Sequence, residues 1–102
     1  IILIMGCRKK EDALYYHDFL KYQKQYINFK YIICYSKTDH IENIFEKTGY
    51  IQKYLNLIKL DYKKDVVFLC GNPFMIDDSI KILKKIQFDN KSIKKEKYII
   101  SI

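Results

Sequence analysis

Four short apolar runs, separated by stretches with helical periodicity, dominate the pattern of the chain. The runs cover residues 1–5, 29–35, 66–69 and 98–102, and the first of them ends at Gly6. The first run is apolar throughout, which is typical of a strand that is buried on both faces of a parallel sheet, and the other three also have the composition of strands. We therefore expect four strands, in this order along the chain.

The segments between these runs predict three helices. Glu11 and Asp12 suit the N-terminus of the first helix by their charge. After them, apolar and aromatic residues recur at helical spacing: Leu14, Tyr15, Phe19, Tyr22 and Tyr26. The second helix is expected over residues 49–58, where Ile51, Leu55 and Ile58 fall on one side.

The third helix has the clearest start signal. Asn72 is a good N-cap and Pro73 is a good first helical residue. A buried stripe follows at Ile76, Ile80 and Leu83, with Lys84 and Lys85 on the solvated side. The charged segment 89–97 is expected to be a loop before the last strand.

This alternation of strands and helices predicts an α/β fold, a parallel sheet with helices on both faces. The crossover connections should be right-handed. With 102 residues, the chain is expected to form one domain.

Three turns carry the candidate chemistry, because each follows a predicted strand. They are Gly6–Arg8, Tyr35–Lys37 and the stretch from Cys70 to Pro73. In open α/β sheets, ligands bind beyond the carboxyl ends of the strands. Glycine lets a ligand approach the backbone closely, and a helix that begins at Pro73 presents free N–H groups. Together with the Arg8, Ser36 and Lys37 side chains, these turns predict a phosphate site.

Four segments, in this order, resemble the NADP-binding domain of the ferredoxin/flavodoxin–NADP reductase family. They are Gly6-Cys7-Arg8 with the helix from Asp12 to Leu20, Tyr35-Ser36-Lys37, Gly49-Tyr50-Ile51-Gln52, and Val67 to Met75 continuing to Asp78. The last segment contains the strongest piece, the pattern Cys-Gly-Asn-Pro-x-Met. The resemblance covers nearly the whole chain and implies an incomplete Rossmann-like domain.

The resemblance also implies two cofactors and a set of site residues. NADP would be bound by this chain, and FAD mainly by a domain that is expected upstream. Arg8, Ser36 and Lys37 would contact the 2′-phosphate, with Lys47 joining them by a looser alignment. Tyr50 would stack on the adenine and Gln52 would hydrogen-bond nearby. Cys70 would be the catalytic residue beside the nicotinamide, followed by the cofactor-binding residues Gly71 and Asn72.

The chain departs from the family pattern in two places that bear on structure and specificity. Lys37 stands where the family usually has arginine. Lysine keeps the positive charge but lacks the guanidinium fork, so the expected preference for NADP over NAD is weaker. The family's first strand and its glycine-rich turn are not found before Ile1. Because that strand is central in the family, we expect a row of unpaired backbone groups in mid-sheet, and a chain that does not fold stably alone.

Charge and composition leave room for other functions. The net charge of +7 favours anionic partners, although Ile, Lys, Tyr and Asn crowd the whole chain, as in proteins encoded by AT-rich genomes. The first hypothesis is an enzyme that moves electrons between NADPH and ferredoxin or flavodoxin. The alternatives are the reductase component of an oxygenase or dehydrogenase system, and a basic nucleic-acid-binding module. Dispersed lysines and the lack of an RNP, KH or zinc-finger signature disfavour a nucleic-acid partner.

Three cysteines without a C-x-x-C pair argue against a disulfide framework or a metal site. They favour a reducing compartment, the cytoplasm or the interior of an organelle. No apolar run approaches the roughly 20 residues that span a bilayer, so no membrane span is expected. His17 and His40 have no ligand-spaced partner and are expected at the surface.

Overall fold

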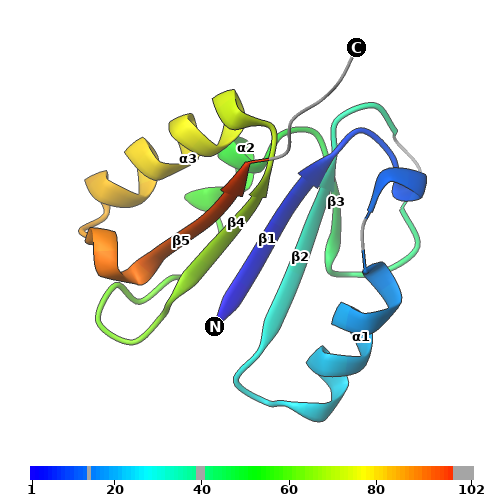
Figure 1. Cartoon of the computed structure of the whole chain (residues 1–102), viewed down its shortest axis with the longest axis horizontal. Helices are drawn as coiled ribbons and strands as arrows, with labels where there is room; N and C mark the ends of the chain where they lie inside the picture. Colours follow the sequence, from blue (N-terminus) through cyan, green and yellow to red (C-terminus); the bar gives the residue numbers. More distant parts are fainter. Residues whose placement is uncertain (14, 39–40, 98–102) are drawn as a thin grey trace.

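The computed structural model describes residues 1–13, 15–38 and 41–97 as five parallel strands and three α-helices (Figure 1). The sheet has the order β3-β2-β1-β4-β5. Its strands are β1 (Ile2–Cys7), β2 (Lys30–Tyr35), β3 (Glu46–Thr48), β4 (Val67–Gly71) and β5 (Ile93–Lys97). The helices are α1 (Tyr16–Gln25), α2 (Ile51–Leu55) and α3 (Pro73–Lys85), with short 3-10 turns at Lys10–Asp12 and Asn90–Ser92. The predicted parallel α/β fold is confirmed.

Strand β1 occupies the centre of the sheet. It pairs with β2 from Ile2 opposite Lys30 onward, and with β4 from Ile2 opposite Val67 onward. The expectation of a row of unpaired groups in mid-sheet is therefore wrong. The physical reason is that an entirely apolar strand is stable only where both its faces are covered and both its backbone edges are paired. The prediction that the chain does not fold stably alone was based on those unpaired groups, so it no longer has that basis.

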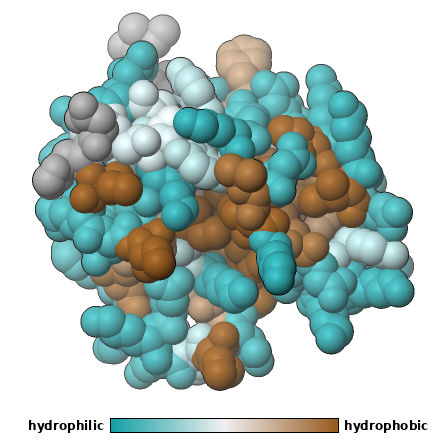
Figure 2. Space-filling model, turned by 180° about the vertical axis from the view of Figure 1, so that it is seen from behind, coloured by the Kyte–Doolittle hydropathy of each residue, from teal (hydrophilic) through white to brown (hydrophobic). Residues whose placement is uncertain are grey.

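Helices cover both faces of the sheet (Figure 1). On one face, α1 contributes Tyr16 to a buried cluster with Tyr31 and Tyr35 of β2. On the other face, α2 and α3 pack over β1 and β4, and the buried side chains are Ile4, Leu69, Ile51, Leu55, Ile76 and Leu83. Figure 2 shows hydrophobic side chains gathered over α2 and α3, with hydrophilic ones around them. The predicted stripe of α3 faces the core, because Ile76 and Leu83 are fully buried and Ile80 is partly buried, whereas Lys84 and Lys85 are exposed.

The C-terminal part differs from the sequence-based expectation. Residues 93–97 form β5, which pairs in parallel with β4, where a loop was predicted. Only Ile93 is apolar in this strand, and Lys94, Lys95 and Lys97 are exposed. An edge strand needs no apolar pattern, and charged side chains on it prevent pairing with other chains. The strand expected over 98–102 lies outside the described residues.

Two further boundaries depart from the hydrophobic pattern. The first helix begins at Tyr16, because Tyr15 adopts a left-handed backbone with φ of 58°. The second helix ends at Leu55 rather than at residue 58. The short β3 was not predicted, since it holds no apolar residue. In the described part of the chain, none of the helices is long and apolar enough to cross a bilayer.

Glu46 is the one charged residue in β3 whose side chain is buried, with 1% of its surface exposed. Its carboxylate accepts hydrogen bonds from Tyr35 Oη at 2.6 Å, from the backbone N–H of Glu42 at 3.1 Å, and from the backbone N–H of Asn43 at 2.9 Å. Asn43 Nδ2 donates a further bond at 3.2 Å. This network fixes the loop that enters β3 and holds it against the end of β2.

Candidate functional site

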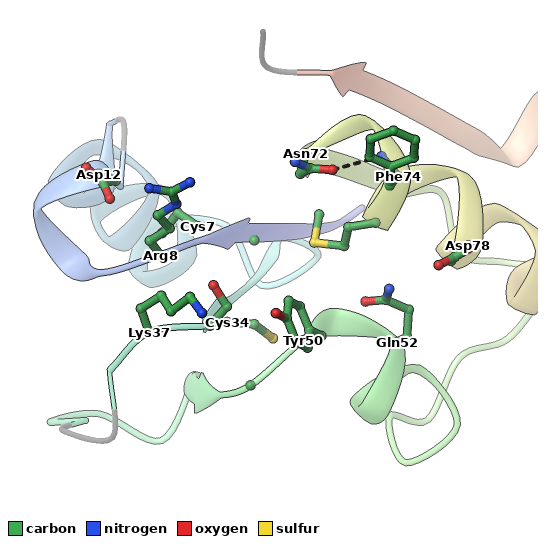
Figure 3. A pocket seen from close by; sticks show the side chains of 14 residues that line it. Cys7, Arg8, Asp12, Cys34, Lys37, Tyr50, Gln52, Asn72, Phe74 and Asp78 are labelled. Atoms are coloured by element: carbon green, nitrogen blue, oxygen red, sulfur yellow. Dashed lines mark hydrogen bonds between the residues drawn. The ribbon is translucent and has the colours of Figure 1, made fainter. Parts of the chain in front are cut away.

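A cavity of about 560 Å³ opens at the carboxyl ends of β1 and β2, between the first turns of α2 and α3 (Figure 3). It is lined by Gly6, Cys7, Arg8, Asp12, Cys34, Ser36, Lys37, Gly49, Tyr50, Gln52, Asn72, Phe74, Met75 and Asp78. The carboxyl edge of a parallel sheet collects the turns that follow several strands. Residues far apart in the sequence are thereby brought to one place.

The turns after β1 and β2 are joined by backbone hydrogen bonds. Ser36 N donates to Cys7 O at 2.9 Å, and Lys37 N donates to Arg8 O at 2.9 Å. These bonds extend the pairing of the two strands past their ends. They place Arg8 next to Lys37, and both side chains lie at the same end of the cavity, with their charged groups pointing in different directions (Figure 3). The predicted convergence of these two turns is confirmed.

The turn before α2 brings an aromatic ring to the same cavity. Gly49 N donates to Tyr35 O at 2.7 Å, and Gly49 adopts a φ of +97°, which favours glycine. The next residue, Tyr50, is the N-cap of α2 and is 57% exposed. Gln52 lies two residues further on, in the first turn of α2, and its buried Oε1 has no hydrogen-bond partner among the described residues. A buried acceptor of this kind is costly unless a donor reaches it.

The N-terminus of α3 forms the third wall. Asn72 Oδ1 accepts a hydrogen bond from Phe74 N at 2.9 Å, as expected for an N-cap followed by proline (Figure 3). The partial positive charge of the helix start lies at the cavity. Phe74 is 80% exposed beside it.

Six of the predicted site residues line the cavity: Arg8, Ser36, Lys37, Tyr50, Gln52 and Asn72. Three do not. Lys47 Nζ donates to Ile44 O at 2.9 Å, and Gly71 lies beneath Met75. Cys70 is 5% exposed and packs in the cluster on the α1 face, because residues alternate along β4 and Leu69 and Gly71 take the other face. The proposed role of Cys70 beside the nicotinamide stays a prediction.

Eight lining residues were not among the predicted site residues: Gly6, Cys7, Asp12, Cys34, Gly49, Phe74, Met75 and Asp78. Cys34 lies opposite Gly6 in the register of β1 and β2, so the pairing of the two strands would have indicated it. Met75 and Asp78 follow Asn72 at steps of three, which places them on one side of α3. Nothing in the sequence distinguishes Phe74 from the other aromatic residues.

Charged and polar side chains lie at both ends of the cavity. Arg8, Lys37 and Asp12 lie at one end, and Gln52 and Asp78 lie at the other (Figure 3). Burial and the nearby Asp12 carboxylate raise the pKa of Cys7 to about 12. Burial and the nearby Cys7 raise the pKa of Cys34 to about 12 as well. Both thiols are therefore neutral near pH 7, and they add no negative charge to the end that holds the two cations.

A family model described as the oxidoreductase NAD-binding domain matches residues 1–81. The chain belongs to this family. The resemblance seen in the sequence is thereby confirmed at the level of an NAD-binding domain of oxidoreductases. No curated protein matches the chain significantly.

Solved structures of a reductase and of a nitric oxide dioxygenase domain share the fold of this NAD-binding domain. A cytochrome P450 reductase, GcoB, from Amycolatopsis has 19% identity and a TM-score of 0.69, over 94% of this chain and 28% of that one. The flavohem-like FAD/NAD binding domain of a nitric oxide dioxygenase from Vibrio cholerae O1 biovar El Tor has 11% identity and a TM-score of 0.70. The match covers 95% of this chain and 50% of that one.

A ferredoxin NADP⁺ reductase from Neisseria gonorrhoeae, solved with bound FAD and NADP, has 15% identity and a TM-score of 0.64, over 94% of this chain and 55% of that one. The chain thus spans about half, or less, of each of these three structures. At these identities the likeness shows the fold of the NAD-binding domain.

Proposed function

We propose that this NAD-binding domain holds NADP(H) in the cavity and serves a flavin-dependent ferredoxin/flavodoxin–NADP reductase. FAD, bound mainly by a domain preceding this chain, would supply the hydride chemistry. The observation that carries the proposal is the meeting of Arg8, Ser36 and Lys37 with Tyr50 and Gln52 around one cavity. These residues come from the turns after β1 and β2 and from the start of α2.

The donor-rich end of the cavity suits the 2′-phosphate. The Arg8 guanidinium offers two parallel N–H donors, and Lys37 and Ser36 add an ammonium and a hydroxyl. A hydrogen bond to a charged group contributes roughly 1.5–3 kcal/mol. Two cations beside one phosphate therefore provide the means to distinguish NADP from NAD, although the carboxylate of Asp12 at the same end opposes part of their field.

The aromatic and acceptor groups suit the adenine. The exposed Tyr50 ring presents a face for stacking at the mouth of the cavity. Gln52 Oε1, which has no hydrogen-bond partner in the described part of the chain, is positioned to accept a hydrogen bond from an amino or hydroxyl group of the ligand. A nucleotide that has a phosphate at one end and an amino or hydroxyl donor at the other would place the phosphate near Arg8 and Lys37 and the donor near Gln52.

The proposed electron partner is ferredoxin or flavodoxin, an acidic carrier by this account. The net charge of +7 and the exposed lysines of β5 support an anionic partner. The ion pair between Lys97 Nζ and Asp77 Oδ1, at 2.9 Å, joins β5 to α3 and leaves Lys94 and Lys95 unengaged by it.

Rapid mixing of the full-length protein with NADPH or NADH tests the proposed function. We expect NADPH to reduce the flavin faster than NADH, as followed by bleaching of the flavin absorbance. The reduced flavin should then be reoxidised when ferredoxin or flavodoxin is added. Negligible reduction by both nucleotides would show that the proposed function is wrong.

Lys37→Arg should strengthen the preference for NADPH. The substitution restores a planar fork where lysine provides a single point charge, and a gain of roughly 1 kcal/mol lowers the KM for NADPH about fivefold. The KM for NADH should stay unchanged. Lys53→Arg, on an exposed position of α2 outside the cavity, is the matched control. An equal effect of both variants would remove Lys37 from the phosphate site.

A further inference from the structure

The side chain of Met75 lies across two glycines at the floor of the cavity. A Cβ atom added to Gly6 would lie 2.3 Å from Met75 Sδ, and one added to Gly71 would lie 2.4 Å from Met75 Cε. Met75 itself is 8% exposed and lines the cavity. The thioether therefore fills the space that the missing side chains of these glycines leave at the ends of β1 and β4.

This position is where a phosphate chain would approach the protein backbone. Glycines allow close approach of a ligand, and the N-terminus of α3 favours negative charge. In the structure, Met75 occupies the space in front of Gly6 and Gly71. A methionine side chain has three rotatable bonds, so it can leave this space without movement of the backbone.

We propose that the Met75 side chain moves away from the two glycines when a dinucleotide binds, and that it stays in place when a mononucleotide binds. This inference rests on the proposed nucleotide site. A nucleoside 2′-monophosphate held by Arg8 and Lys37 leaves Met75 over the glycines. The diphosphate of a bound dinucleotide takes its place beside Gly6 and the start of α3. Met75 thereby sets how strongly the cavity distinguishes between ligands of different length.

The test uses the two methionines of the chain, Met5 and Met75. Met5 is 1% exposed in the cluster on the α1 face, where Tyr31 Oη approaches its Sδ at 4.0 Å. The full-length protein is labelled with ¹³C-methyl methionine, and the resonances of Met5 and Met75 are assigned by Met5→Leu and Met75→Leu. Saturating NADP⁺ should shift the Met75 resonance, saturating 2′-AMP should leave it in place, and Met5 should not respond to either ligand.

A substitution gives a second, independent readout. Met75→Ala removes the group that must be displaced, so the ratio of the affinities for NADP⁺ and 2′-AMP should rise roughly tenfold. Met75→Leu keeps the volume with a stiffer side chain, and it should leave this ratio unchanged or lower it. Both affinities are measured by calorimetry on the full-length variants.

The outcomes separate this inference from the proposed function. If calorimetry detects NADP⁺ binding and the Met75 resonance does not move, the proposed displacement of Met75 is wrong, whereas the nucleotide site is supported. An equal shift with 2′-AMP would overturn the distinction by ligand length. If neither nucleotide binds, the proposed function is wrong and the inference falls with it.

Discussion

Arg8→Ala should raise the KM for NADPH roughly 10- to 150-fold, while the KM for NADH changes by less than about threefold. Arg8 is the only arginine in the chain, and its backbone carbonyl is tied to Lys37 at the carboxyl edge of the sheet. Without Arg8, a phosphate at this end of the cavity would lose charged hydrogen bonds. The neighbouring Lys37 cannot replace them, because its ammonium lacks the paired donors of a guanidinium. Steady-state kinetics with both nucleotides measures the effect.

Lys9→Ala is the matched control for the loss of one positive charge. Lys9 is adjacent in sequence and exposed, and it does not line the cavity. Its substitution should change neither KM by more than about twofold, because exposed charges outside the site are screened. A rise equal to that of Arg8→Ala would mean that overall charge, and not the cavity, governs NADPH binding.

Glu46→Ala should lower the free energy of unfolding by about 3 kcal/mol. The substitution removes the shared acceptor of Tyr35 Oη and of the backbone N–H groups of Glu42 and Asn43. The buried Tyr35 hydroxyl would be left without this partner. Urea unfolding, followed by far-UV circular dichroism, measures the loss.

Glu42→Ala is the comparison for this experiment. The Glu42 side chain forms an exposed ion pair with Lys10 at 3.1 Å. Pairs of this kind contribute roughly 0–1 kcal/mol, so the loss should be small. Similar losses for the two variants would contradict the assigned role of the buried network.

The contribution of Glu46 should depend on pH in the acid range. Burial acts to raise the pKa of this carboxyl, but the hydrogen bonds from Tyr35, Glu42 and Asn43 outweigh it and hold the pKa below its usual value. A lowered pKa in the folded state stabilises the fold above the pKa of the unfolded chain. The difference in stability between the wild type and Glu46→Gln should therefore shrink as the pH falls through the folded pKa.

Much of the fold was predictable because burial leaves a direct mark on the sequence. The run of residues 1–5 has no polar member, and it becomes the central strand. Asn72 and Pro73 place the start of α3, since their capping chemistry is local. Strands β3 and β5 lie at the two edges of the sheet, where pairing comes from the backbone and no apolar pattern is required.

The candidate site was predictable only as far as topology determines it. Parallel strands end at one edge, so Arg8, Ser36 and Lys37 had to come close together. The direction of a side chain depends on strand register and on helix packing. For this reason the sequence did not show that Cys70 faces α1 or that Met75 covers Gly6 and Gly71.

A crystal structure of the full-length protein with NADP⁺ would show directly where the 2′-phosphate binds. We expect the 2′-phosphate to lie within hydrogen-bonding distance of both the Arg8 guanidinium and Lys37 Nζ, with the adenine against the Tyr50 ring. A nucleotide bound elsewhere, or bound here with its phosphate remote from Arg8 and Lys37, would contradict it.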